Sequence, residues 1–220
     1  FIPGVSFRNL CILDGFDGNP DLKPPHDYAG QKVSGLMPSG PGAEAIADLI
    51  LKSQEALADH AVNKERARQG KAPVNSAWFW GMGRAASMPS FYDRHGKSAA
   101  VVTGVDLVRG LAELLEMETV HVPGATGYVD TNYEGKADAV LGALEGCDFV
   151  FLHVEAPDEA GHEGELDLKV KAIEDFDQRA VARVLAGLEK FDDYRVVALP
   201  DHEIPWWQRC HRDGLVPFAL

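Results

Sequence analysis

From about residue 77 onward, short and almost wholly apolar runs alternate with longer stretches of helical periodicity. The apolar runs are Ala77–Trp80, Ala99–Thr103, Thr119–Val122, Phe149–Val154 and Val196–Leu199. Helical patterns separate several of them, at Val105–Met117, Asn132–Leu144 and Leu166–Leu188. Apolar strands that alternate with helices are typical of a parallel sheet covered by helices on both faces. The predicted fold class is therefore α/β, with three layers in the order α/β/α.

The residues before this region follow a different pattern. Residues 1–42 are rich in turn signals, with one possible strand at Ser6–Leu13. A helix is expected from about Ala43 to Arg68, and Gly70 and Pro73 close it. We therefore predict a boundary between a small α+β unit, residues 1–72, and the α/β unit, residues 73–220.

Composition excludes several classes of protein. A net charge of −13 argues against nonspecific binding of nucleic acid, although local arginines can still hold a phosphate. No uncharged apolar stretch of about 18 residues occurs, so no membrane partner is expected. Cys11, Cys147 and Cys210 lie far apart without metal-site spacing. They predict reduced thiols in a cytoplasmic protein.

One candidate site follows the apolar run that begins at Phe149. Ligands of open parallel sheets bind beyond the carboxyl ends of the strands, so residues at this position are of interest. Asp158 and His162 are four positions apart, which places both side chains on one face of a helix. A carboxylate and an imidazole so placed can share a divalent ion. The alternative is an ordinary acidic helix N-terminus.

A second candidate site follows the apolar run Val196–Leu199. Asp201 and His202 come directly after it, and His211 follows nine residues later. Five oxygen and nitrogen ligands suit two divalent ions better than one. Asp and His ligands without Cys suit Mn²⁺ or Zn²⁺ better than Ca²⁺ or a thiolate site. The alternative is that these histidines are hydrogen-bonded core residues.

These segments resemble a known family. Glu155-Ala-Pro-Asp-Glu-Ala-Gly-His162 and Leu199-Pro-Asp-His202 are similar to archaeal-type 2,3-bisphosphoglycerate-independent phosphoglycerate mutases, a branch of the alkaline phosphatase superfamily. The resemblance covers nearly the whole chain, including the stretches Asn63–Arg66, Trp80–Arg84, Pro89–Phe91, Val122–Gly127 and Asp130–Tyr133. It implies an alkaline-phosphatase-type sandwich preceded by the tail of an inserted, lid-like domain. A rival name within the same branch is a homoserine-kinase-like protein.

The resemblance also implies ligands and cofactors. Asp158, His162 and His211 would hold one divalent metal, and Asp201 and His202 would belong to a second. Mn²⁺ is favoured, with Zn²⁺, Co²⁺ or Mg²⁺ as alternatives, and no 2,3-bisphosphoglycerate is expected. In the family the nucleophilic serine and another Asp ligand precede the insert. This sequence is therefore expected to begin inside the insert and to lack both groups, which leaves the catalytic residue unassigned.

Cationic side chains are expected to hold the phosphate and carboxylate of the substrate. Arg84 follows an apolar run and two glycines, and Arg109 follows the predicted strand at Ala99–Thr103. Arg8 and His26 would approach from the insert, whose closure would exclude water.

The activity implied is the glycolytic interconversion of 3-phosphoglycerate and 2-phosphoglycerate through a phosphoserine. One alternative is a metal-dependent phosphatase or phosphotransferase that acts on another small phosphorylated acid. Another is an inactive metal-binding fragment that needs a missing N-terminal half or a homo-oligomer as its partner. The expected ligand in the first two cases is a small phosphorylated hydroxy acid.

Overall fold

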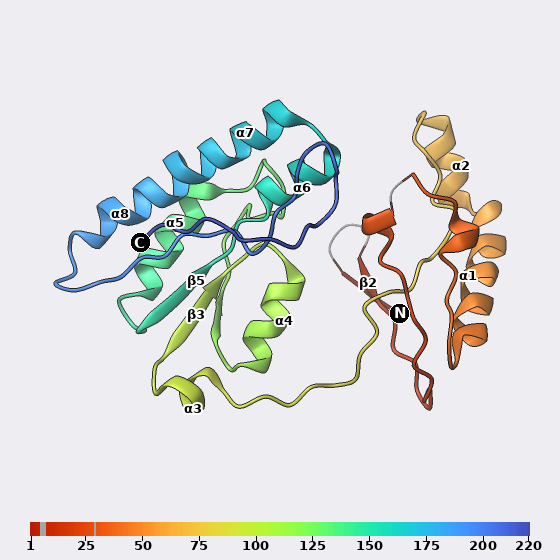
Figure 1. Cartoon of the computed structure of the whole chain (residues 1–220), viewed down its shortest axis with the longest axis horizontal. Helices are drawn as coiled ribbons and strands as arrows, with labels where there is room; N and C mark the ends of the chain where they lie inside the picture. Colours follow the sequence, from red (N-terminus) through yellow and green to blue (C-terminus); the bar gives the residue numbers. More distant parts are fainter. Residues whose placement is uncertain (5–7, 29) are drawn as a thin grey trace. The chain divides into compact units, whose positions relative to one another are not determined.

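The computed structural model describes residues 1–4, 8–28 and 30–220. Its ribbon (Figure 1) divides into two compact units. The smaller unit is Ile12–Arg84, and the larger one combines Phe1–Cys11 with Ala85–Leu220. The division therefore lies after Arg84 and not after residue 72. The reason is local bonding: Trp78 Nε1 donates to the carbonyl of Lys23 at 2.8 Å, which ties the irregular segment to the smaller unit.

A parallel three-stranded sheet forms the centre of the larger unit. Its strands are β3 (Ala99–Val102), β4 (Glu118–Val120) and β5 (Phe149–Leu152), in the order β4-β3-β5. Helix α4 (Asp106–Leu114) connects β3 to β4, and α5 (Tyr133–Ala143) connects β4 to β5. The prediction of an α/β fold with a parallel sheet is confirmed.

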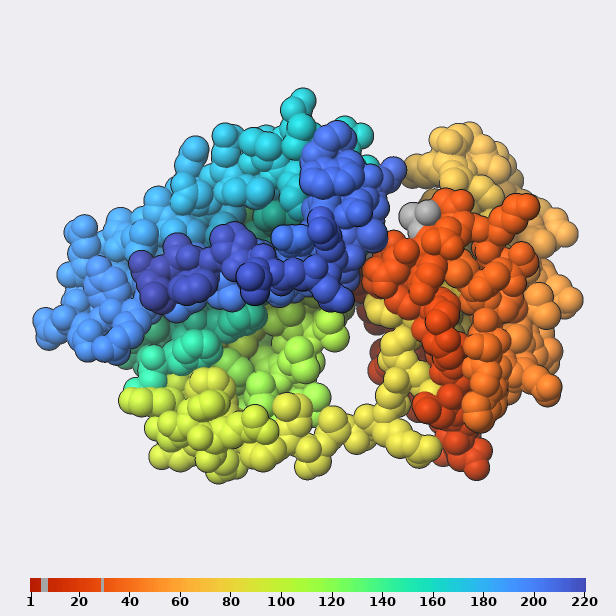
Figure 2. All heavy atoms as spheres, viewed as in Figure 1, coloured from red at the N-terminus to blue at the C-terminus, as the bar shows by residue number. Residues whose placement is uncertain are grey.

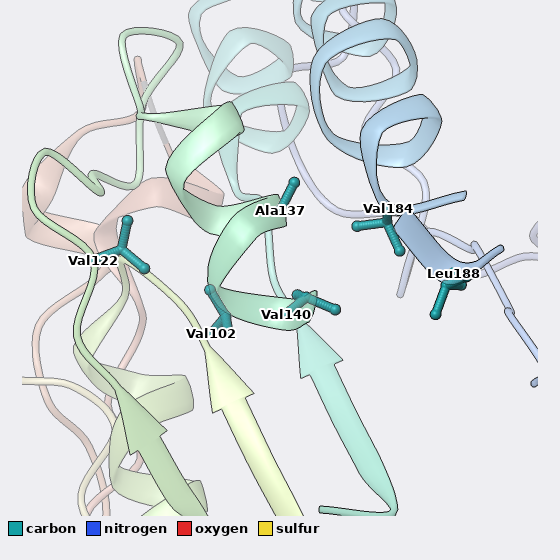
Figure 3. Packing of buried hydrophobic residues seen from close by; sticks show 6 residues of the cluster. All are labelled: Val102, Val122, Ala137, Val140, Val184 and Leu188. Atoms are coloured by element: carbon teal, nitrogen blue, oxygen red, sulfur yellow. The ribbon is translucent and has the colours of Figure 1, made fainter. Parts of the chain in front are cut away.

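The two faces of β3 contact different helices. Val101 packs with Ala112 of α4 and with Phe91, which begins the short helix α3 (Phe91–His95). Val102, one residue later, points to the other face because side chains alternate along a strand. There it joins a cluster (Figure 3) of Val102, Val122, Ala137, Val140, Val184 and Leu188. Helices therefore cover the sheet on both faces.

One long helical run covers the outer side of α5. It follows α6 (Ala156–Glu163) and consists of α7 (Leu166–Asp175), the π-helical segment η3 (Phe176–Val181) and α8 (Ala182–Leu188). The predicted helix at Leu166–Leu188 is thus confirmed. A row of ion pairs connects this run to α5. The partners are the same number of residues apart in every pair, which is what two helices that run in parallel produce. The pairs are Glu134 with Arg179, Asp138 with Arg183 and, beyond the helix ends, Glu145 with Lys190.

The smaller unit contains the short 3₁₀ helices η1 (Pro25–Tyr28) and η2 (Val33–Gly35) and two α-helices. These are α1 (Ala43–Ala58) and α2 (Ala61–Arg68), so the single helix predicted to Arg68 is wrong. The break occurs because His60 adopts an extended backbone and its ring accepts a hydrogen bond from the Val62 amide. His60 therefore caps a new helix.

The first strands belong to the larger unit and are shorter than predicted. β1 (Ile2–Pro3) pairs antiparallel with β2 (Asn9–Leu10). Of the strand predicted at Ser6–Leu13, only Asn9–Leu10 is a strand, and residues 6 and 7 lie outside the described residues.

Two further predicted strands are wrong. Ala77–Trp80 has no regular structure, and its bonding is to the smaller unit. Val196–Leu199 forms a single antiparallel bridge, between Ala198 and Ala219. Val196 does pack against the core cluster, so its apolarity reflects burial, but the backbone has no ladder with β5 in the described residues. The C-terminal segment, violet-blue in Figure 2, lies exposed on the larger unit, and Leu215 and Leu220 are almost fully exposed.

Two other observations bear on the class of protein. In the described residues, no helix combines the length and apolarity that a membrane crossing requires. Cys11, Cys147 and Cys210 are free cysteines in the structure.

Candidate metal centre

Helix α6 places the first pair of candidate ligands at the carboxyl edge of the sheet. It follows β5 after a short connection, and Pro157 in its first turn favours the helical start. Ala156 and Ala160 are fully buried against the core, which orients the helix. Asp158 and His162 lie one turn apart, and Nε2 of His162 is 3.6 Å from Oδ2 of Asp158.

The segment after Leu199 returns the second group of candidate ligands to α6 (Figure 1). Ile204 is buried, and its carbonyl accepts a hydrogen bond from Nζ of Lys169 on α7 at 2.6 Å. A backbone bridge between Glu203 and Arg212 then closes the loop. Because of this bridge, His202 and His211 come together although they are nine positions apart in the sequence.

The candidate ligands converge in space. Asp158, His202 and His211 each offer a ligand atom, and these atoms all lie within 4.8 Å of one another. Nε2 of His202 and Nε2 of His211 lie 3.9 Å and 4.0 Å from Oδ1 of Asp158. Nε2 of His162 is 3.1 Å from Nε2 of His211. The structure therefore brings three of the five predicted metal ligands together, and His162 lies beside two of them, Asp158 and His211.

Asp201, the fifth predicted ligand, lies at the rim of this cluster. Its side chain is largely exposed, and its Oδ2 is 3.4 Å from Nε2 of His202. Its other oxygen accepts a hydrogen bond from the His202 amide at 3.0 Å. Asp201 is thus placed beside the cluster but is not part of the three-residue convergence.

The donor set fits a divalent cation. Two imidazole nitrogens that lie 3.1 Å apart need a proton or a cation between their electron pairs. One carboxylate with three imidazoles is a ligand set that Zn²⁺ or Mn²⁺ accepts. Nδ1 of His202 is buried and has no hydrogen-bond partner in the described structure. A bound group or a water molecule would supply the hydrogen-bond partner that this buried atom lacks.

Electrostatics around Asp158 also suit a cation. Burial, and then the nearby charge of Glu155, raise the pKa of Asp158 to about 6, while His162 and His202 act in the opposite direction. Burial alone would raise the pKa of Glu155 as well. The hydrogen bond and charge of His153, followed by the charge of Arg8, outweigh burial and lower it. Two carboxylates confined together favour the binding of a positive charge.

Two of the predicted substrate cations lie in the larger unit and have partners there. Nη2 of Arg8 is 3.4 Å from Oε1 of Glu159, the residue that follows Asp158. Arg109 donates to Asp106 at 3.0 Å and to the carbonyl of Thr103 at 3.4 Å, beside the carboxyl end of β3.

The other two predicted substrate residues lie in the smaller unit. Arg84 is exposed at its end. His26 is in η1, where its ring makes an edge contact with Trp80 at a centroid distance of 5.0 Å. Their assignment to substrate stays a prediction.

Two features beside the candidate ligands were not part of the predicted site. The first is a chain of side chains: Thr103 Oγ1 is 3.2 Å from His153 Nδ1, and His153 Nε2 is 3.1 Å from Glu155 Oε2. The second is Lys136, which is buried and donates to the carbonyls of Thr126 and His153 at 3.3 Å. A lysine among the apolar positions of a helical pattern was the available signal for the second feature.

A family model connects the chain to known proteins. Residues 9–220 match the model described as the Metalloenzyme superfamily.

Curated relatives give more specific names. A protein of Geobacter sulfurreducens named probable 2,3-bisphosphoglycerate-independent phosphoglycerate mutase is 48% identical over 220 residues, which is all of this chain and 55% of the relative. A protein of Methanosarcina acetivorans with the same name, without "probable", is 44% identical over 222 residues, all of this chain and 56% of the relative. The resemblance inferred from the motifs is confirmed. The chain spans about half the length of these relatives.

A solved structure agrees with these matches. The PH0037 protein from Pyrococcus horikoshii is similar with a TM-score of 0.59 and 29% identity, over 80% of this chain and 46% of that one.

Proposed function

The chain belongs to the metalloenzyme superfamily, and from that premise we propose that it carries the metal-holding part of a 2,3-bisphosphoglycerate-independent phosphoglycerate mutase. The reaction would interconvert 3-phosphoglycerate and 2-phosphoglycerate. Because the chain spans about half of its curated relatives, the substrate and the activity of a whole protein are part of the proposal. The use of Mn²⁺, a cytoplasmic location and a role in glycolysis are also part of the proposal.

The convergence of Asp158, His202 and His211 carries this proposal, since their ligand atoms lie within 4.8 Å of one another. Together with His162 they would hold one divalent ion, and Asp201 would extend the site toward a second. Such ions neutralise charge on a transferring phosphoryl group and lower the pKa of an attacking hydroxyl. Oxygen and nitrogen donors without thiolates support Mn²⁺, with Zn²⁺, Co²⁺ and Mg²⁺ as alternatives.

The remaining residues of this edge would orient the substrate. Arg8, held near α6 by Glu159, would supply a planar cation for a phosphate or carboxylate. Arg109 would offer a second cation from the start of α4. When the substrate binds, each arginine would leave its carboxylate partner within the chain and pair with a phosphate or carboxylate group of the substrate. Arg84 and His26 are proposed as further substrate groups from the smaller unit.

A chimera tests this function. The matching segment of the Methanosarcina acetivorans relative is replaced by this chain, and formation of 2-phosphoglycerate from 3-phosphoglycerate is followed with and without Mn²⁺. The unmodified relative serves as the positive control. We expect turnover that depends on Mn²⁺ and that Asp158→Asn abolishes.

Other outcomes separate the alternatives. A folded chimera that binds Mn²⁺ but forms no 2-phosphoglycerate would contradict the proposal, provided that the unmodified relative is active. Release of inorganic phosphate in place of the isomer would favour a phosphatase.

A further inference from the structure

Arg209 has an unusual backbone conformation for its residue type. Its φ is +58°, which lies in the left-handed region. Among the described non-glycine residues, Glu116 is the only other one with a positive φ. A side chain with a Cβ pays roughly 1 kcal/mol for this conformation. Arg209 lies on the loop between His202 and His211, so neighbouring contacts must compensate for this cost beside the candidate metal centre.

Two reciprocal hydrogen bonds join Arg209 to His162. Nε of Arg209 donates to the carbonyl of His162 at 2.9 Å. In the other direction, Nδ1 of His162 is 3.1 Å from the carbonyl oxygen of Arg209. A carbonyl oxygen only accepts, so the proton of this bond belongs to Nδ1. The left-handed backbone is what turns that carbonyl toward the ring.

Gly164 provides the surface on which the Arg209 side chain lies. It ends α6 with a φ of +78°. A Cβ at this position would lie 2.9 Å from Cδ and 3.0 Å from Nε of Arg209. The glycine therefore both terminates the helix and leaves room for the Arg209 side chain to reach the carbonyl of His162.

The proton on Nδ1 determines the state of the other ring nitrogen of His162, Nε2. With a proton on Nδ1, a neutral His162 presents Nε2 as an electron-pair donor. Nε2 is the atom that lies 3.1 Å from His211 and 3.6 Å from Asp158. A hydrogen bond to the far nitrogen is the usual way in which a metal-binding histidine is oriented.

We propose that Arg209 is a positioning residue that holds His162 with its proton on Nδ1, so that Nε2 is presented to a divalent cation shared with Asp158 and His211. This inference rests on the proposed function only for the presence of the cation. The hydrogen-bond geometry is a property of the metal-free chain.

The first measurement locates the imidazole proton without metal. The whole chain is labelled with ¹⁵N, and histidine ring nitrogens are observed by NMR at a pH where His162 is neutral. We expect Nδ1 of His162 to carry the proton in the wild type and a mixture of both forms in Arg209→Ala. Nε2 protonated in the wild type, or an unchanged proton position in Arg209→Ala, would overturn the inference.

The second measurement is the Mn²⁺ dissociation constant by calorimetry. Loss of an orienting partner typically weakens metal binding 10- to 100-fold, and we expect a change of this order in Arg209→Ala. Arg209→Gly adopts the left-handed backbone without strain, so it keeps the carbonyl in place and loses less affinity. Arg195→Ala is the control, since Arg195 is exposed and lies outside the loop that carries His202 and His211.

A purely structural role for Arg209 predicts a different pattern. In that case affinity would follow thermal stability, and the well-folded fraction of Arg209→Ala would bind Mn²⁺ as tightly as the wild type, which would overturn the inference. A wild-type chain that binds no Mn²⁺ would contradict the proposed function alone. The proton position would then still decide the role of Arg209.

Discussion

At the scale of single residues, Lys136 presents a cation in an interior position. Its side chain is buried, and its ammonium group donates to two backbone carbonyls, those of Thr126 and His153. These carbonyls belong to the loop after β4 and to the end of β5. Lys136 therefore connects two segments at the edge of the sheet where the candidate metal centre lies.

Lys136 should make stability depend on pH. Burial lowers the pKa of Lys136 from 10.5 to about 8, while the charge of Glu155 acts in the opposite direction. Between these values the unfolded chain binds more protons than the folded chain, so this group adds stability as the pH rises. The free energy of unfolding of the wild type relative to Lys136→Met should rise by about 2–3 kcal/mol across this interval, measured by urea unfolding. Parallel curves for the two proteins would contradict this prediction.

Asp158 should dominate metal binding because it is the carboxylate that all three histidines approach. Asp158→Asn should weaken Mn²⁺ binding by more than the roughly 10- to 100-fold typical of an outer partner. Asp167→Asn, an exposed change in the first turn of α7, should leave the dissociation constant unchanged. Calorimetric titration of both variants checks this, and equal losses would point to a general charge effect.

Residue spacing predicted part of this site. Asp158 and His162 could be paired because a helix brings residues four apart to one face. The approach of His202 and His211 needed the Glu203–Arg212 bridge, which no local pattern indicates. The role of Arg209 depends on its backbone conformation, and a residue type that rarely adopts a positive φ offers no signal for it.

At the scale of elements, the carboxyl end of β3 and the loop after β4 approach closely at Gly104. A Cβ there would lie 2.4 Å from the carbonyl oxygen of Thr126 and 2.6 Å from its carbonyl carbon. Both are backbone atoms that cannot turn aside. Gly104→Ala should therefore cost about 2 kcal/mol or more of stability.

Gly110 is the matched control for Gly104. It lies within α4, and a Cβ there would meet nothing within 4 Å. Gly110→Ala should stabilise the protein by about 0.5–1 kcal/mol, because glycine is a poor helix former. Chemical unfolding of both variants checks the pair, and destabilisation by both would contradict the packing described.

The contact between α5 and α8 should depend on its apolar side chains and less on its ion pairs. Val184 belongs to the core cluster, whereas the neighbouring Arg183 pairs with Asp138 at 2.6 Å on the exposed side. Val184→Ala should cost about 1–3 kcal/mol, and Arg183→Ala about 0.5 kcal/mol or less. The reverse order in urea unfolding would show that the ion pairs hold the helices together.

Elements were predictable where a pattern had one interpretation. Ala99–Val102 is apolar, flanked by helices and buried on both faces, and it is the central strand. Ala77–Trp80 and Val196–Leu199 are equally apolar, but they are only partly buried, and in the described residues neither forms a ladder with the central sheet. The break at His60 depends on a ring nitrogen that caps a helix, and histidine is not among the residues usually expected there.

At the scale of the whole molecule, the net charge of −13 coexists with a small cluster of imidazoles and carboxylates. The parallel sheet explains the position of Asp158 and His162, which follow β5 at its carboxyl edge. His202 and His211 do not follow a strand of this sheet and depend on the Glu203–Arg212 bridge. The domain division was less predictable, since it depends on how residues 73–84 pack and not on a change in composition.

Anomalous diffraction from a crystal of the chain grown with MnCl₂ would show whether Asp158 and the histidines around it hold a cation. We expect a manganese peak bonded at about 2–2.3 Å to a carboxylate oxygen of Asp158 and to ring nitrogens of His162, His202 and His211. A fully occupied manganese elsewhere, with these side chains arranged as in the metal-free chain, would contradict it.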